Sequence, residues 1–202
     1  MKTLRLFIIL AAILVLQNGC RSSKPVSPRF FLLEYPAKTE ISDTIVTLPY
    51  SLEITNVDVN PVYSSTQIAI REGEMEVHYF ANNHWASRPN QSLGRFISIF
   101  YKRNPFFETA ATRFWNVQPD FRLITTVYNM EVIRERSVFH ARLNVEFRIE
   151  TAEGKVIAIH TSDNIRQLER RDLNQFARAI SNMFFEELYY FSKKAHFEIS
   201  QQ

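Results

Sequence analysis

The chain has 202 residues, a formal net charge of +3 at pH 7, one cysteine, 17 phenylalanines and 8 tyrosines. A charge this close to zero gives no long-range field for nucleic acid, and a single cysteine excludes an internal disulfide. A chain of this length that is rich in apolar and aromatic residues is expected to fold around a sizeable core.

The N-terminal twenty residues resemble a bacterial lipoprotein signal. Lys2 and Arg5 precede an apolar run of about 11 residues, too short for the roughly 20 residues of a membrane-spanning helix. A small residue precedes Cys20, whose thiol is the expected point of lipid attachment. Removal of residues 1–19 with both cations lowers the formal charge from +3 to +1. Because Gln17 stands where leucine is usual, an ordinary signal peptide or an anchor helix with an incidental cysteine stays open.

A flexible tether is expected after the signal peptide. Residues 20–29 contain the lipidated cysteine, small polar residues, two prolines and three cations, without an apolar period. Arg21 follows the cysteine, as in the class of enteric lipoproteins that is released to the outer membrane. The remaining residues, 30–200, are expected to form a single α+β domain.

Short strands are expected in the first part of this domain. Residues 30–34 form a first apolar run, and residues 44–59 are rich in Val, Ile and Thr, with an edge or a bend expected at Pro49. Two alternating runs, 67–71 and 74–80, flank a Glu-Gly pair that predicts a tight hairpin.

An amphipathic helix follows the hairpin. It is predicted to begin near Pro89 and to stop at Asn104-Pro105. Its apolar residues recur at helical spacing and share one face: Leu93, Phe96, Ile97, Phe100 and Tyr101. Residues 106–119 are expected to be a strand or irregular.

The second half of the domain predicts a sheet and a long helix. Residues 121–158 indicate an antiparallel meander of three strands that turns at 134–137 and 153–154, with one core face and one solvent face. A charged loop is expected at 162–171, and a final helix at 172–197. The expected fold class is therefore α+β, an antiparallel sheet with a three-strand meander packed against two main helices.

The final helix has more apolar surface than one face requires, so we expect it to lie in a groove of the sheet or against a partner. Candidate contacts with a partner or lipid are Trp85, Phe184, Phe185, Tyr189 and Tyr190. Arg170 and Arg171 of the charged loop are candidates for contact with anionic headgroups. The simpler interpretations are a core role for Trp85 and a solvated loop for the arginines.

The sequence offers no recognisable catalytic or metal-binding set. Beyond the signal, the glycines are Gly73, Gly94 and Gly154, too scattered for a nucleophile elbow or a phosphate loop. The five histidines lie in five separate segments without the spacing of a zinc site. We therefore expect no enzymatic activity, no cofactor and no metal.

Several features occur in an order that is typical of one family. They are a lipoprotein start followed by Phe30-Phe31-Leu32-Leu33, then Ile54-x-x-Val57-x-Val59-x-Pro61-x-Tyr63, Ile68-x-Ile70-Arg71, and Trp85-Ala86 between a hairpin and a helix. With the meander and long terminal helix, this order resembles the ABC-type transport auxiliary lipoprotein component family, the PqiC/YmbA-like lipoproteins that accompany MCE-domain lipid transport systems.

The resemblance implies a non-catalytic accessory of a lipid transport system, lipid-anchored in the outer membrane and facing the periplasm. The implied partners are an MCE-domain protein and, through it, an ABC permease and ATPase. A homo-oligomer is a further expectation, and nucleic acid is not an expected partner. Two alternatives stay open: a lipoprotein that itself binds an apolar ligand or lipid between its sheet and helices, and a lipoprotein of envelope assembly or structure.

Overall fold

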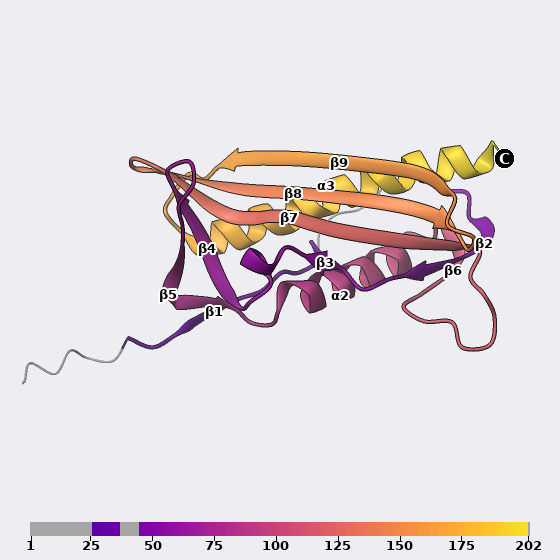
Figure 1. The fold of residues 1–202 in the computed structure, drawn as a ribbon, viewed down its shortest axis with the longest axis horizontal. Coiled ribbons are helices and arrows are strands. Elements are labelled where there is room, and N and C mark those ends of the chain that lie inside the picture. Colours follow the sequence, from indigo (N-terminus) through magenta and orange to yellow (C-terminus); the bar gives the residue numbers. More distant parts are fainter. Residues whose placement is uncertain (1–25, 37–44, 202) are drawn as a thin grey trace, which may run out of the picture.

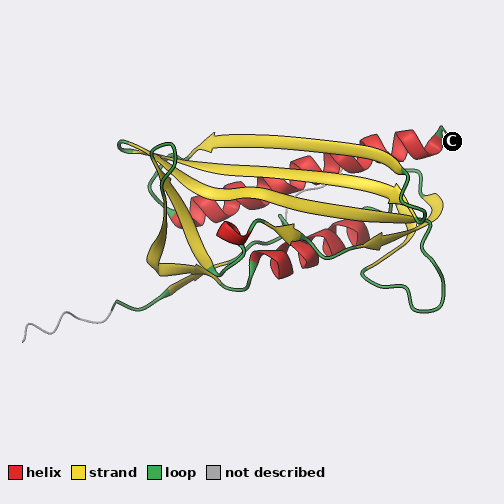
Figure 2. Cartoon of the chain, viewed as in Figure 1, coloured by secondary structure: helices red, strands yellow, loops and turns green. Residues whose placement is uncertain are grey.

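A sheet of nine strands, covered on one face by two helices, makes up the body of the chain (Figures 1 and 2). The computed structural model describes residues 26–36 and 45–201. The strands are β1 (Arg29–Phe31), β2 (Leu48–Ile54), β3 (Asp58–Val59), β4 (Gln67–Glu72), β5 (Val77–Trp85), β6 (Phe107–Ala111), β7 (Phe121–Glu135), β8 (Val138–Thr151) and β9 (Val156–Gln167). The helices are the short 3-10 turn η2 (Pro61–Tyr63), α2 (Pro89–Arg103) and α3 (Leu173–Ser200).

The predicted meander is present as β7, β8 and β9, which pair in antiparallel fashion along most of their lengths. Alternate residues of β8 are buried, so one face of the sheet is core, as the pattern predicted. A register shift between Val127 and Asn129 changes which residues of β7 point inward. Before the shift odd-numbered residues face the core, whereas after it Met130 and Val132 do. Glu131 therefore lies on the outer face of the sheet.

The sheet as a whole is mixed, so the prediction of an antiparallel sheet is correct only for part of it. β2, β3 and β4 pair in parallel with successive stretches of β7, on the side opposite β8. β6 adds to β2 in parallel, and β1 adds to β5 in parallel. Strand direction depends on where each chain segment returns to the sheet, which side-chain alternation does not encode.

Three strand boundaries differ from the prediction. β5 continues to Trp85, so the segment before α2 is strand. β9 continues to Gln167 through most of the predicted charged loop. Residues 44–59 contain β2 and β3, with residue 44 outside the described part. The pairing of β2 with β6 shifts register between Leu48 and Ser51, an irregularity that includes Pro49, where an edge or a bend was expected.

The remaining strand predictions are largely confirmed. The β4–β5 hairpin is antiparallel, and Gly73 in its turn has a φ of 86°, a conformation that glycine adopts at little cost. β1 spans Arg29–Phe31, the start of the first predicted run. The ambiguous stretch 106–119 contains β6, followed by a loop at residues 112–120.

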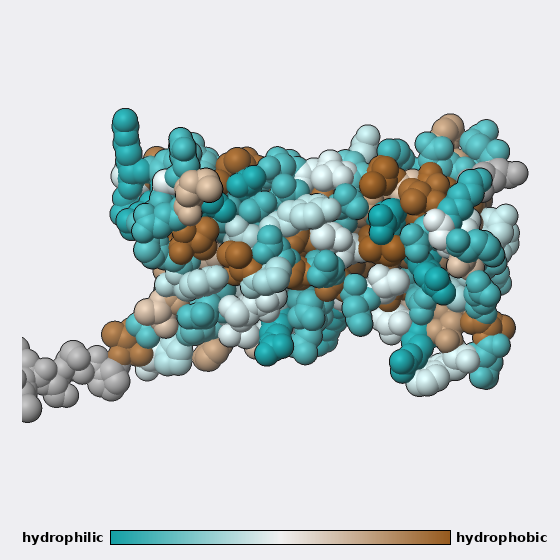
Figure 3. All heavy atoms as spheres, in the orientation of Figure 1, coloured by the Kyte–Doolittle hydropathy of each residue, from teal (hydrophilic) through white to brown (hydrophobic). Residues whose placement is uncertain are grey.

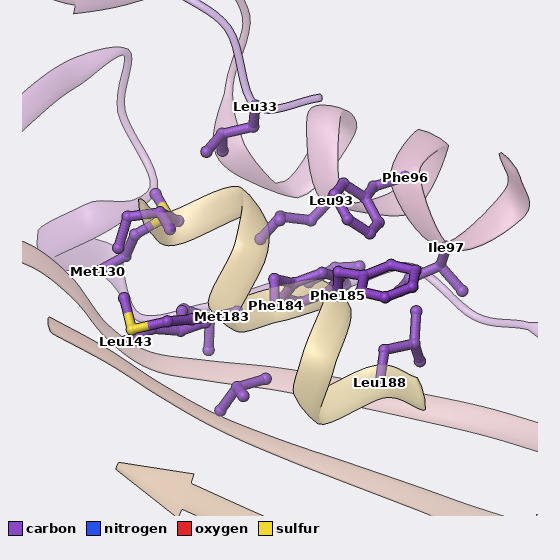
Figure 4. Close-up of a cluster of buried hydrophobic side chains, with 14 of the residues drawn as sticks. Leu33, Leu93, Phe96, Ile97, Met130, Leu143, Met183, Phe184, Phe185 and Leu188 are labelled. Carbon is purple, nitrogen blue, oxygen red and sulfur yellow. The ribbon is translucent and has the colours of Figure 1, made fainter. Parts of the chain in front are cut away.

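The two helices pack their apolar faces onto the sheet and onto each other. The predicted apolar residues of α2 are all buried, and Asn104 caps the helix as expected. The Asp172 carboxylate accepts a hydrogen bond from the Asn174 amide at the start of α3. In Figure 4, side chains of α2 face Phe184 and Phe185 of α3, above Leu143 of β8. The wide apolar surface of α3 is thus explained by burial against both the sheet and α2.

Candidate functional site

Several of the proposed contact residues lie in the core. Trp85 is 2% exposed and packs against Phe176 of α3, with 5.6 Å between ring centroids. Phe184 and Phe185 are also buried. These three side chains are out of reach of a partner or lipid in this conformation. Cys20, the predicted lipid attachment site, lies outside the described residues.

The other candidates lie at the surface, and their contact with a partner stays a prediction. Tyr189 is half-buried, whereas Tyr190 is exposed and its ring lies 4.9 Å from that of His160 on β9. Arg170 and Arg171 are exposed just before α3. Arg171 donates a hydrogen bond to the Ser137 carbonyl at 2.9 Å, which ties it to the β7–β8 turn. The structure does not bring these residues together with the buried aromatics into one surface.

A ladder of alternating charges crosses the outer face of the sheet. Arg71, Glu131, Arg142 and Asp163 come from β4, β7, β8 and β9 in turn, joined by hydrogen bonds of 2.9, 3.4 and 2.8 Å. Glu131 is fully buried because Tyr63 covers it and donates a hydrogen bond at 2.8 Å. Burial and the hydrogen bond to Glu131 raise the pKa of Tyr63, so its hydroxyl stays protonated. The ladder satisfies a buried carboxylate and offers no free group for chemistry.

A second polar cluster joins β9 to α3. Glu187 contacts the imidazole of His160 at 2.6 Å and accepts a hydrogen bond from Asn164 at 2.6 Å. Burial acts to raise the pKa of Glu187, but these hydrogen bonds outweigh it and hold the pKa below its ordinary value. Arg166 pairs with Glu186 beside them. The inner face of β9 is therefore polar and binds the helix through charges.

Residues 32–36 run between the two helices, and we call this segment the strap. The Tyr35 ring packs 5.5 Å from Phe96 of α2 and 5.4 Å from Phe185 of α3, while the Arg103 guanidinium lies 4.9 Å from its centre. A groove of about 860 Å³ separates the strap from α3, and one of about 430 Å³ separates it from α2. The described chain that leads toward Cys20 is thus fixed to both helices.

A further surface was missed by the sequence reasoning. Between Glu76 and Asp120 the chain has five cations and one carboxylate, Glu108. The loop of residues 112–120 projects from the body and presents Trp115, which is 79% exposed (Figure 1). The scarcity of carboxylates in this stretch was the signal available in the sequence. That the cations share one surface becomes clear only when α2 and the loop are placed in the fold.

Metal binding and membrane crossing have no support within residues 26–36 and 45–201. There, no cluster of three or more His, Cys, Asp or Glu side chains is arranged to hold a metal ion. None of the helices in this part of the chain is long and apolar enough to span a membrane. The two polar clusters described above, around Glu131 and around Glu187, instead join one element to another through ion pairs and hydrogen bonds.

The comparisons with known proteins agree with the architecture. The family described as the ABC-type transport auxiliary lipoprotein component matches residues 31–186. A DUF330 protein from Xanthomonas campestris has a similar structure, with a TM-score of 0.68 at 15% identity, covering 87% of this chain and 96% of its own. A solved uncharacterized protein gives a TM-score of 0.64 at 12% identity, covering 84% of this chain and 99% of its own. No curated protein matches the sequence.

Proposed function

Because the chain belongs to the ABC-type transport auxiliary lipoprotein component family, we propose that it is a non-catalytic accessory of an MCE/ABC-type lipid transport system. In this role the chain is lipid-anchored in the outer membrane and faces the periplasm. Its partners are an MCE-domain protein and, through it, an ABC permease and ATPase. The family match over most of the domain is the observation that carries the proposal.

The architecture supports a binding role over a catalytic one. The buried carboxylate of Glu131 pairs with arginines of neighbouring strands, and the partly buried carboxylate of Glu187 is hydrogen-bonded to His160 and Asn164 of β9. A sheet of nine strands with two packed helices gives a rigid body, and the strap fixes the N-terminal end of the described chain to that body. Such a body is suited to hold a partner within reach of the anchoring membrane.

Co-purification tests the proposed partnership. The full chain and an MCE-domain protein of the same organism are co-expressed, solubilised in mild detergent and purified through a tag on the MCE protein. We expect the two proteins to elute together in a constant ratio. Elution of the MCE protein alone, under conditions where both proteins are present in the membrane fraction, would contradict the partnership.

A second candidate function is supported by the groove beside α3. Its volume of about 860 Å³ is within the range of small-molecule sites. It is bordered by Phe31 at the end of β1, by Leu32 of the strap, and by Ala177 and Ser181 on α3. This mixed lining supports binding of an amphipathic ligand such as a lipid. If the groove has this function, lipid should remain bound when the chain is purified without a partner.

A further inference from the structure

The cations of the α2 region differ from most arginines of the sheet in having no carboxylate partner. On the sheet, arginines such as Arg71, Arg122 and Arg142 pair with carboxylates. The α2 region contributes five exposed cations: Arg88, Arg95, Lys102, Arg103 and Arg113. In the described part of the chain, the ion pairs include none of these five. Their charges are therefore free to attract an external anion.

Three of these cations lie on one side of α2. Arg88, Arg95 and Lys102 are spaced seven residues apart, which places them along one helical face, opposite the buried stripe that contains Leu93 and Phe96. Arg95 and Arg103 also border the groove of about 430 Å³ between α2 and the strap. A guanidinium in such a groove can donate paired hydrogen bonds to phosphate oxygens.

Exposed apolar side chains flank this basic face at both ends. At one end the chain enters through Val26, Phe30 and Leu32, which are 70%, 63% and 56% exposed. At the other end the loop of residues 112–120 presents Trp115 and Val117, 79% and 69% exposed. In Figure 1 the entering chain, α2 and the loop lie along the same lower margin of the molecule. In Figure 3 hydrophobic atoms appear at both ends of that margin, with hydrophilic atoms between them.

The loop itself has the chemistry of a membrane interface. The Arg113 guanidinium lies 4.4 Å from the centre of the Trp115 ring. Tryptophan favours the headgroup region of a bilayer, and arginine can keep its charge at the phosphates while its stem lies along apolar groups. Lys102 and Thr112 border one recess, so the loop begins next to the basic face of α2. The two features form one continuous surface.

We propose that this surface, formed by the α2 cations and the loop of residues 112–120, lies flat on an anionic phospholipid bilayer. Charge complementarity identifies phosphate-bearing headgroups as the occupant, and the chain that leads back to Cys20 leaves from the same margin (Figure 1). Three carboxylates lie in or beside this surface: Glu34, Glu108 and Asp120, which ends the loop and accepts hydrogen bonds from Ser51. The five cations still leave the surface with a net positive charge. The proposal changes the expected headgroup contact from Arg170 and Arg171 to α2.

The two tryptophans of the chain provide the test. The full chain is inserted through its N-terminal anchor into vesicles of phosphatidylglycerol and phosphatidylcholine with brominated acyl chains, which quench nearby tryptophan emission. We expect strong quenching of Trp115, weak quenching in phosphatidylcholine alone, and recovery at high salt. The variant Trp115→Phe leaves Trp85, which is 2% exposed, as an internal reference that the bromines should not quench.

Paired charge variants test the role of α2. Each cation near an anionic surface raises the ratio of docked to undocked protein about fivefold. The double variant Arg95→Gln with Lys102→Gln should therefore lower this ratio about thirtyfold. The matched control, Arg136→Gln with Arg170→Gln, removes two exposed cations elsewhere and should change this ratio little.

The proposal is wrong if Trp115 is not quenched in anionic vesicles, or if the α2 variant and the control variant lose quenching equally. It is equally wrong if Trp115 emission responds only to an added MCE protein. The quenching measurements on the wild-type chain and the charge variants are made without a transport partner, so their result is independent of co-purification.

Discussion

Replacing Phe184 by alanine is expected to lower the free energy of unfolding by about 3–5 kcal/mol. The ring is fully buried, and its centroid lies 5.1 Å from that of Phe96 on α2 and 5.4 Å from that of Phe147 on β8. It is therefore in contact with both helices and the sheet at once, as Figure 4 shows for the helices. Truncation leaves a cavity that no single element can close by moving alone. Chemical denaturation followed by circular dichroism measures the change.

Phe197→Ala is the matched control, because Phe197 lies on the same helix and is 63% exposed. We expect this variant to change the free energy of unfolding by less than about 0.5 kcal/mol. Equal losses in the two variants would show that α3 is not fixed to α2 and the sheet by the contacts described above.

Replacing Glu131 by glutamine is expected to cost about 3 kcal/mol, because it leaves the partly buried charge of Arg71 without its carboxylate. Arg71 and Arg142 both donate hydrogen bonds to Glu131, and their side chains are only 20% and 24% exposed. Arg142 retains Asp163, whereas Arg71 retains the Tyr63 hydroxyl and the Glu74 carbonyl. The loss should therefore stay at the lower end of the range for broken buried pairs. Thermal unfolding of the two proteins at neutral pH measures the difference.

Glu186→Gln provides the comparison on the surface. Glu186 pairs with Arg166, but both side chains are about half exposed, at 50% and 41%. Solvent screens such a pair, and its loss should cost less than about 1 kcal/mol. If Glu131→Gln were no more destabilising than this control, the ladder on the outer face would contribute little to holding β4, β7 and β8 together.

The periodic parts of the fold were predictable from sequence. One face of α2 and one face of β8 are buried against a continuous apolar layer. Apolar residues therefore recur at helical spacing from Leu93 to Tyr101 and at every second position in β8. The end of β9 was not predictable in this way. Its inner face meets Glu186 and Glu187 of α3 through Arg166, Asn164 and His160. These inward-facing residues are polar, so the sequence lacks the apolar alternation that predicts a half-buried strand.

The candidate site was only partly predictable for a related reason. Large aromatic residues such as Trp85 and Phe184 are common both in cores and at interfaces. Their ring contacts between α3 and its neighbours show that they are core residues. Trp115 lies in a loop without periodicity, so no sequence pattern distinguishes it from a core tryptophan. The parallel pairing of β2, β3 and β4 with β7 depends on contacts between residues far apart in the chain, which local pattern does not contain.

Redistribution of labelled phospholipid between the inner and outer membranes tests the transport role most directly. The rate is measured in cells that lack this chain, in cells that lack the ABC ATPase of the proposed transport system, and in complemented cells. We expect loss of the chain to slow redistribution as loss of the ATPase does. The wild-type chain should restore the rate, and the Cys20→Ala variant should not. A normal rate without the chain, in cells where loss of the ATPase slows redistribution, would contradict its role as a component of the system.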